Sequence, residues 1–80
     1  AAPLIAELHE RAESIRSAEI ERYAARLSGL SVEQRDVVDA LSKAVVAKLL
    51  HSPSLQLKHS AGTPQGERIA AALRDLCDIE

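Results

Sequence analysis

The chain has 80 residues and a formal net charge of −2, and helix-forming residues dominate its composition. Ala, Glu, Lys, Leu and Arg fill 43 of the 80 positions, a share typical of long helices when a period near 3.6 accompanies it. Tyr23 is the single aromatic residue, which excludes a platform that stacks nucleic-acid bases, and the slight acidity argues against DNA or another polyanion as the partner. No apolar run is long enough to span a membrane.

The first predicted helix covers residues 1–28, with Pro3 in its first turn and Ser28-Gly29 ending it, the glycine in a left-handed turn. Its apolar residues recur with spacings of three and four, except for one step of five between Ile15 and Ile20. That step rotates the apolar stripe by about 100°, so we expect the two halves of the helix to face different neighbours. The charged residues, including Glu13 and Arg16 at i,i+3 spacing, are interpreted as a solvent-exposed face.

The second predicted helix covers residues 31–51. Ser31 followed three residues later by Gln34 is the pattern of a capping box. An apolar stripe follows and ends near His51, where a positive charge complements the carbonyl end of a helix.

Two Ser/Thr-Pro pairs predict two more helix starts. Ser52-Pro53 predicts a short third helix over residues 53–61, and Thr63-Pro64 predicts a fourth over residues 64–78. Gly66 in the first turn of this last helix is expected to weaken that end. The sequence therefore predicts an all-α domain of about four helices with short connections.

The residues able to support catalysis or metal binding are few and scattered. Cys77 is the single cysteine, which excludes an internal disulfide and a zinc site built on several thiolates. His9, His51 and His59 belong to three different predicted helices and have no metal-binding spacing. We therefore expect no catalytic, cofactor-binding or metal-binding residue in these 80 residues, and we interpret Cys77 as a small packing residue.

A shortage of large side chains predicts that the helices complete their core against something else. The chain lacks Phe, Trp and Met, and an 80-residue domain with a single core gains little stability from it. Two copies that bury the same apolar stripes would share one larger core. We therefore expect the helices to pair into a helical-bundle homodimer, and the absence of an initiator Met favours a piece of a longer protein.

The segment from Lys48 to Lys58 resembles a known family. It reads Lys-Leu-Leu-His-Ser-Pro-Ser-Leu-Gln-Leu-Lys, similar to the K-L-L-H-x-P-x-x-x-L-K stretch of the carboxy-terminal dimerisation domain of glutamyl-tRNA reductase. The matching motif positions are Lys48, Leu49, Leu50, His51, Pro53, Leu57 and Lys58. The upstream segments around Pro3–Leu8, Arg11–Arg16 and Glu19–Arg22 resemble the end of the long connecting helix in that family.

The resemblance implies the role of the longer protein. Glutamyl-tRNA reductase is a cytoplasmic oxidoreductase that uses NADPH to reduce glutamyl-tRNA to glutamate-1-semialdehyde, the first step of tetrapyrrole (porphyrin and haem) biosynthesis. Its catalytic cysteine and its NADPH site lie in other domains, so neither is expected here and Cys77 is not the nucleophile. The fragment itself is expected to be non-catalytic and to pair two subunits.

The dimerisation hypothesis names an interface. We expect seven residues to lie at or near it: Ile20, Tyr23, Leu27, Leu41, Val45, Leu49 and Leu73. The alternative, from another functional class, is a free-standing helical adaptor that binds a partner helix in a groove. For Lys48, His51 and Lys58 two interpretations stay open, namely contact with tRNA phosphate or a regulatory partner, and a structural role at helix ends.

Overall fold

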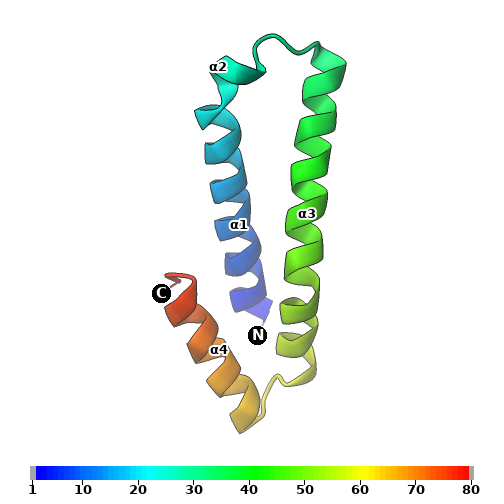
Figure 1. Cartoon of the computed structure of the whole chain (residues 1–80). Helices are drawn as coiled ribbons and strands as arrows, with labels where there is room; N and C mark the ends of the chain where they lie inside the picture. Colours follow the sequence, from blue (N-terminus) through cyan, green and yellow to red (C-terminus); the bar gives the residue numbers. More distant parts are fainter. Residues whose placement is uncertain (1, 80) are drawn as a thin grey trace.

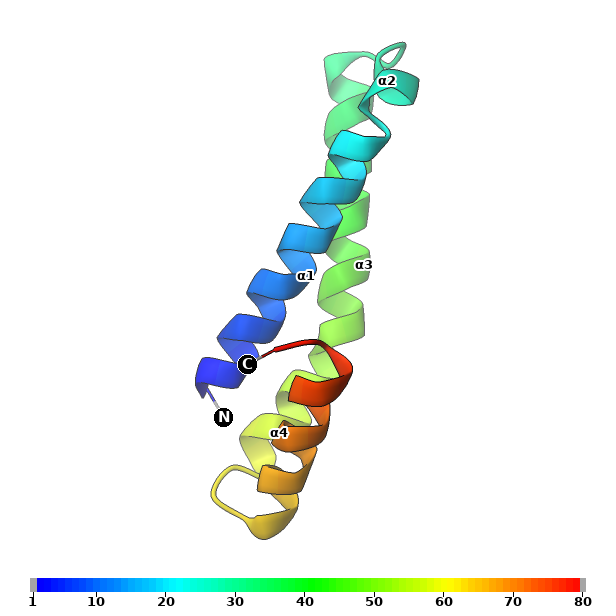
Figure 2. The same ribbon diagram turned by 90° about the vertical axis from the view of Figure 1, so that its left-hand side faces the viewer.

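The computed structural model describes residues 2–79, and over that range it contains helices and turns and no strand. In chain order the helices are α1 (Ala2–Arg22), α2 (Ala24–Leu27), α3 (Val32–His59) and α4 (Pro64–Leu76). α1 and α3 lie side by side and antiparallel, and α4 turns back along the end of this pair where α1 begins and α3 ends (Figures 1 and 2). The predicted all-α class is confirmed. None of the described helices is long and apolar enough to cross a membrane.

The start of α3 is the capping box that the sequence predicts. The Ser31 hydroxyl accepts a hydrogen bond from the Gln34 backbone N–H at 3.1 Å, and the Gln34 side chain accepts one from the Ser31 N–H at 2.9 Å. Both donors would otherwise lack an intrahelical partner, so this pair fixes the residue at which the long helix begins.

The single helix predicted over residues 1–28 is wrong in one respect, because the structure interrupts it at Tyr23. The Tyr23 backbone leaves the helical region, with φ −95° and ψ 8°, and α2 then adds a single turn. This turn brings Leu27 to the wall of a hollow that it shares with Val38 of α3. Gly29, expected in a left-handed turn, has no positive φ.

The separate third helix predicted over residues 53–61 is also wrong, because α3 continues through Pro53 to His59. A proline inside a helix removes one backbone hydrogen bond, at a cost of about 3 kcal/mol. Continuation across Pro53 carries Leu57, which is 2% exposed, into the core. Burial of a leucine offsets much of that cost, so tertiary packing overrides the local stop signal.

The turn between α3 and α4 depends on two glycines. Gly62 has φ +80°, a left-handed conformation that glycine adopts without strain. Thr63 then caps α4, its hydroxyl accepting a hydrogen bond from the Gly66 N–H at 2.9 Å, as predicted. Gly66 does more than weaken the first turn: it is buried, and a Cβ there would lie 1.9 Å from the Ser60 carbonyl oxygen.

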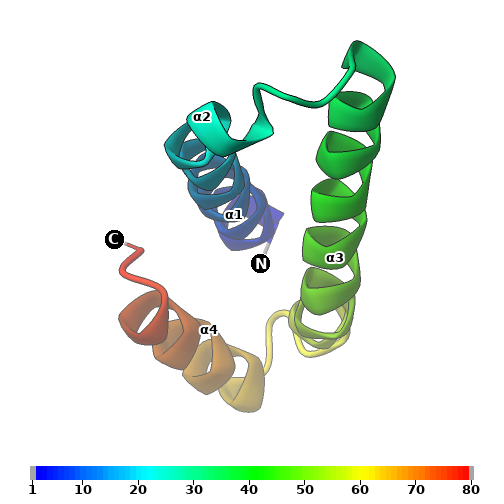
Figure 3. The same ribbon diagram turned by 45° about the horizontal axis from the view of Figure 1, so that its top comes forward.

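The fully buried core is small and lies at one end of the molecule. The buried hydrophobic side chains among the described residues are Leu4, Leu8 and Leu57, where α4 lies alongside α1 and α3. Seen with its top brought forward, the molecule has α1, α3 and α4 at three corners (Figure 3). Among the described residues, α4 does not reach the other half of the α1–α3 pair, where the single turn α2 follows α1 (Figure 1). The radius of gyration is 15.6 Å, against about 12 Å for a compact chain of this length.

Gly66→Ala should destabilise the α3–α4 turn by about 1–3 kcal/mol, because the added methyl group overlaps backbone atoms that cannot move independently. Thermal unfolding followed by circular dichroism at a fixed chain concentration measures this as a lower midpoint. Gly29→Ala is the matched control, since a Cβ at Gly29 meets nothing within 4 Å. Equal midpoints for the two variants would contradict the role assigned to Gly66.

Candidate interaction surface

The exposed side of α3 carries a row of large aliphatic side chains. Val37, Leu41, Val45 and Leu49 follow one another at intervals of four residues and are 66%, 62%, 50% and 70% exposed. Residues four apart lie above one another on a helix, so the four side chains form a continuous strip. Isolated exposed apolar residues are ordinary on a protein surface, whereas a continuous strip marks a site of interaction.

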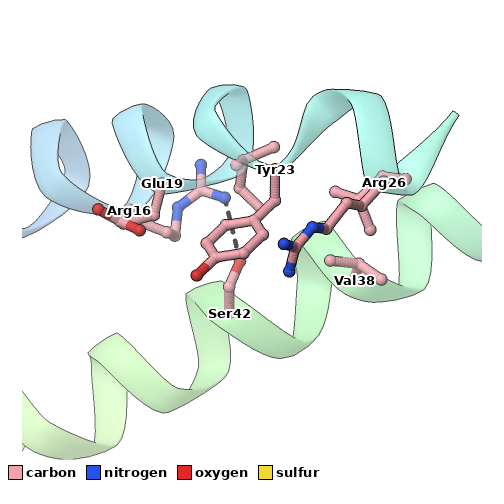
Figure 4. Close-up of a pocket in the computed structure, with 8 residues that line it drawn as sticks. Arg16, Glu19, Tyr23, Arg26, Val38 and Ser42 are labelled. Carbon is pink, nitrogen blue, oxygen red and sulfur yellow. Dashed lines mark hydrogen bonds between the residues drawn. The ribbon is translucent and has the colours of Figure 1, made fainter.

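Two apolar hollows lie between α1 and α3 next to this strip. One, of about 360 Å³, is lined by Ile20, Tyr23, Leu27 and Val38 together with Arg16, Glu19, Arg26 and Ser42 (Figure 4). The other, of about 520 Å³, is lined by Ala12, Ile15, Arg16, Val38, Leu41, Ser42, Val45 and Val46. We define the α1–α3 apolar face as Ile15, Ile20, Tyr23, Leu27, Val38, Leu41 and Val45.

A polar cluster joins α1 to α3 at the middle of this face. The Arg16 Nη1 donates to Asp39 Oδ1 at 2.6 Å and to Ser42 Oγ at 3.2 Å, which links the two helices. The Arg16 Nε donates to Glu13 Oε2 at 2.8 Å, and Nη2 donates to the other oxygen of the same carboxylate. Lys43 Nζ lies 3.1 Å from Asp39 Oδ2. We call these five residues, Glu13, Arg16, Asp39, Ser42 and Lys43, the Arg16 cluster.

The hydrogen bonds of the Arg16 cluster favour the ionised forms of Glu13, Arg16 and Asp39. Hydrogen bonds from Arg16 lower the pKa of the Glu13 carboxyl, and hydrogen bonds from Arg16 and then Lys43 lower the pKa of Asp39. The hydrogen bonds to Glu13 and then Asp39 raise the pKa of Arg16. The Arg16 side chain is 8% exposed, so the expectation of a fully solvent-exposed charged face fails at this residue.

The structure gathers most of the predicted interface residues. Ile20, Tyr23 and Leu27 line one hollow, and Leu41 and Val45 line the other. Leu49 continues the exposed strip of α3 beyond the hollows, whereas Leu73 is half-buried on α4 and lines neither hollow. Sequence reasoning omitted Ile15 and Val38 from the interface. A signal for Val38 was present, because it lies in the apolar stripe of the second predicted helix.

The Lys48–Lys58 segment lies within α3 and not at a helix end, apart from Lys58. His51 was expected to complement a helix terminus, and this is wrong because α3 continues for eight more residues. His51, Ser54 and Lys58 line a hollow of about 310 Å³ with His9 of α1, whose Nε2 lies 3.4 Å from Ser54 Oγ. For Lys48, His51 and Lys58, contact with tRNA phosphate or a regulatory partner was one of two interpretations, and these positions do not test it.

Cys77 is the C-cap of α4, half-buried beside Leu8 and Leu50, and serves as part of an apolar wall. Within residues 2–79 no group of three or more His, Cys, Asp and Glu side chains is placed to hold a metal ion. The surface features with a definite geometry are therefore the α1–α3 apolar face and the Arg16 cluster.

Comparison with known proteins gives a consistent picture over the whole chain. A family profile described as glutamyl-tRNAGlu reductase, dimerisation domain, matches residues 1–79. Proteins named glutamyl-tRNA reductase from Chloroflexus aurantiacus and Roseiflexus castenholzii are 42% and 45% identical over 80 residues, which is all of this chain and 18% of each relative. The reductase of Salinispora arenicola is 39% identical over 79 residues, or 99% of this chain and 17% of its own length. No solved structure matches.

The lowered carboxyl pKa values predict a specific loss of stability in acid. The unfolded chain takes up protons at Asp39 and Glu13 at a higher pH than the folded chain does. The two carboxylates therefore contribute to the free energy of unfolding above about pH 4.5, and this contribution is lost as the pH falls below about 4. Urea unfolding between pH 7 and pH 3 should show a smaller acid-induced loss for Asp39→Asn than for the unchanged chain.

Glu19→Gln is the control for this pH series, because the described hydrogen bonds and ion pairs of Glu19 go to the exposed Arg22 within α1 and none goes to α3. Its pH profile should follow that of the unchanged chain. A profile of Asp39→Asn that also parallels the unchanged chain at every pH would rule out Asp39 as an acid-sensitive link.

Proposed function

The chain belongs to the glutamyl-tRNA reductase dimerisation-domain family, and from this we propose that it joins two reductase subunits through the α1–α3 apolar face. The observation that carries the proposal is the exposed row on α3, bordered by two apolar hollows and left uncovered by α4. A second copy of the same chain is the occupant that the family implies.

The chain exposes more surface than a compact monomer of its mass, and the excess matches the area that one copy buries in an obligate dimer. The accessible area of the chain is 6014 Å². A compact monomer of 8.6 kDa exposes about 4,700 Å², so this chain exposes about 1,300 Å² more. Obligate dimers bury about 2,000 Å² or more in total, which is about 1,000 Å² from each copy. The excess is thus of the size that one twofold interface removes.

The shape of the face suits helices as partners. The hollows lie between two helices, and the row on α3 supplies protruding side chains of matching chemistry. Side chains such as Leu41 and Val45 of one copy can enter the hollows of the other, as knobs enter holes in helical bundles. Residues of a twofold interface are used by both copies, so one row and one pair of hollows suffice. Leu49 and Leu73 remain predicted contacts at the margins.

We further propose the activity of the complete protein. Relatives that extend well beyond this domain are named glutamyl-tRNA reductase, and this chain spans about 18% of their length. The complete protein is accordingly proposed to act in the cytoplasm and to reduce glutamyl-tRNA with NADPH in porphyrin biosynthesis. NADPH and the catalytic residues are assigned to the remainder of the protein, and the present domain sets the distance between two active halves.

The rival function is a helical adaptor that binds a helix of another protein in the same groove. Both functions use the α1–α3 apolar face, but they differ in what fills it. A homodimerisation domain associates with itself in the absence of any other protein, whereas an adaptor stays monomeric until its partner is added.

Val45→Glu should convert the dimer to a monomer, because it places a carboxylate inside the proposed contact and burial of an unpaired charge is strongly unfavourable. We expect self-association to weaken about a hundredfold or more. Sedimentation equilibrium at micromolar concentration measures it, with a mass near twice 8.6 kDa for the unchanged chain.

Val32→Glu is the matched control, since Val32 is 66% exposed in the first turn of α3 and lines neither hollow. The same substitution there should leave the dimer intact. A monomeric unchanged chain with full helix content would refute homodimerisation, and a dimer that survives Val45→Glu would place the interface elsewhere.

A further inference from the structure

The Arg16 cluster lies at the centre of the α1–α3 apolar face. Arg16, Val38 and Ser42 line both hollows, so they form the wall that the two hollows share. Figure 4 shows Arg16 bonded to Ser42 across the two helices, with the Tyr23 ring beside them. Any partner that fills both hollows must pass over this wall. Of the three residues that line both hollows, Arg16 and Ser42 are polar, and both belong to the Arg16 cluster. Such a partner therefore covers the cluster.

The hydrogen bonds and charges of the Arg16 cluster are largely satisfied within the chain, so a partner can cover it at low cost. Four of the five guanidinium N–H groups of Arg16 are already engaged, and its side chain is 8% exposed. Two positive charges, on Arg16 and Lys43, balance two negative charges, on Glu13 and Asp39. A second copy can therefore remove the remaining water from Arg16 without leaving an unpaired charge, the condition under which a buried ion pair is tolerated.

The apolar strip alone does not fix where the second copy docks. Its four members are Val or Leu at intervals of four residues, so a shift by four residues, about 6 Å, exchanges one aliphatic side chain for another. Buried polar residues remove such ambiguity in helical bundles, because the shifted arrangements leave them against apolar partners.

We propose that Arg16 sets the register of the dimer: the Arg16 cluster, fixed between α1 and α3, defines the single position at which a second copy can cover both hollows. This inference rests on the proposed pairing through the α1–α3 apolar face. Arg16 is thus a specificity-determining residue, and its contribution is to the uniqueness of the pairing more than to its affinity.

The test measures distances between two copies. The nitroxide label is attached to Glu21→Cys in a Cys77→Ser background, because Glu21 is an exposed position of α1 outside both hollows. Pulsed electron paramagnetic resonance then measures the distance between the labels of the two copies. We expect one narrow distance for the otherwise unchanged chain. Arg16→Met keeps the long apolar stem and removes the charge, and Asp39 retains Lys43 as a partner. This variant should dimerise with equal or greater affinity and give a second or much broader distance distribution.

Two further variants make the outcome decisive. Arg22→Met removes an exposed arginine from an otherwise similar i,i+3 pair with Glu19 and should keep the single narrow distance. Arg16→Met/Asp39→Leu removes both members of the interhelical ion pair and should broaden the distance distribution as Arg16→Met does.

A narrow, unshifted distance in both Arg16 variants overturns the proposal. Loss of pairing in both variants with helix content intact also overturns it, because Arg16 would then supply affinity and not register. Absence of any interprotomer distance in the unchanged chain refutes instead the pairing itself.

Discussion

The structure depends on a mismatch between the apolar surface of α3 and the surface that its own chain can cover. α3 is 28 residues long and carries aliphatic side chains on the side that faces α1 and also on a second side. α4 has 13 residues and accompanies only one end of α3, where Leu4, Leu8 and Leu57 are buried. Along the rest of their length α1 and α3 pack against each other alone among the described helices, and many of their aliphatic side chains stay exposed. Burial of these exposed side chains against a second surface would be favourable, and this is the basis of the proposed pairing.

The Arg16 cluster addresses a different requirement from the apolar face. Apolar contacts supply free energy in proportion to area but discriminate weakly between alignments of similar aliphatic residues. Hydrogen bonds from Arg16 to Asp39 and Ser42 have fixed geometry, so they set how α1 lies against α3. The hollows on either side of Arg16 take their shape from that alignment. The polar and apolar parts of the surface therefore depend on each other. The Arg16 cluster fixes the alignment of α1 on α3, and the apolar side chains supply the free energy gained on burial.

The sequence predicted local features well where the determining interactions are local. The Ser31–Gln34 capping box, the Thr63-Pro64 helix start and the all-α class each follow from hydrogen bonds or periodicities within a few residues. The predictions failed where distant contacts compete with local ones. Ser52-Pro53 has the local signature of a helix start, and burial of Leu57 overrides it. In the candidate surface, the apolar members could be predicted from their periodicity, but the link from Arg16 to Asp39 could not, because the two lie 23 positions apart.

By itself, then, the sequence determined the helical class, the family and the presence of apolar residues beyond what a small core holds, because composition, motif and periodicity are properties of the chain alone. Only the tertiary structure decided which of those residues stay exposed and which charged residue is withdrawn from water. That division depends on how α1 and α4 lie against α3, and therefore on contacts between residues far apart in the chain. Gly66 is a shorter-range case of the same kind, because only the three-dimensional path of the α3–α4 turn shows that a Cβ there would lie 1.9 Å from the Ser60 carbonyl oxygen.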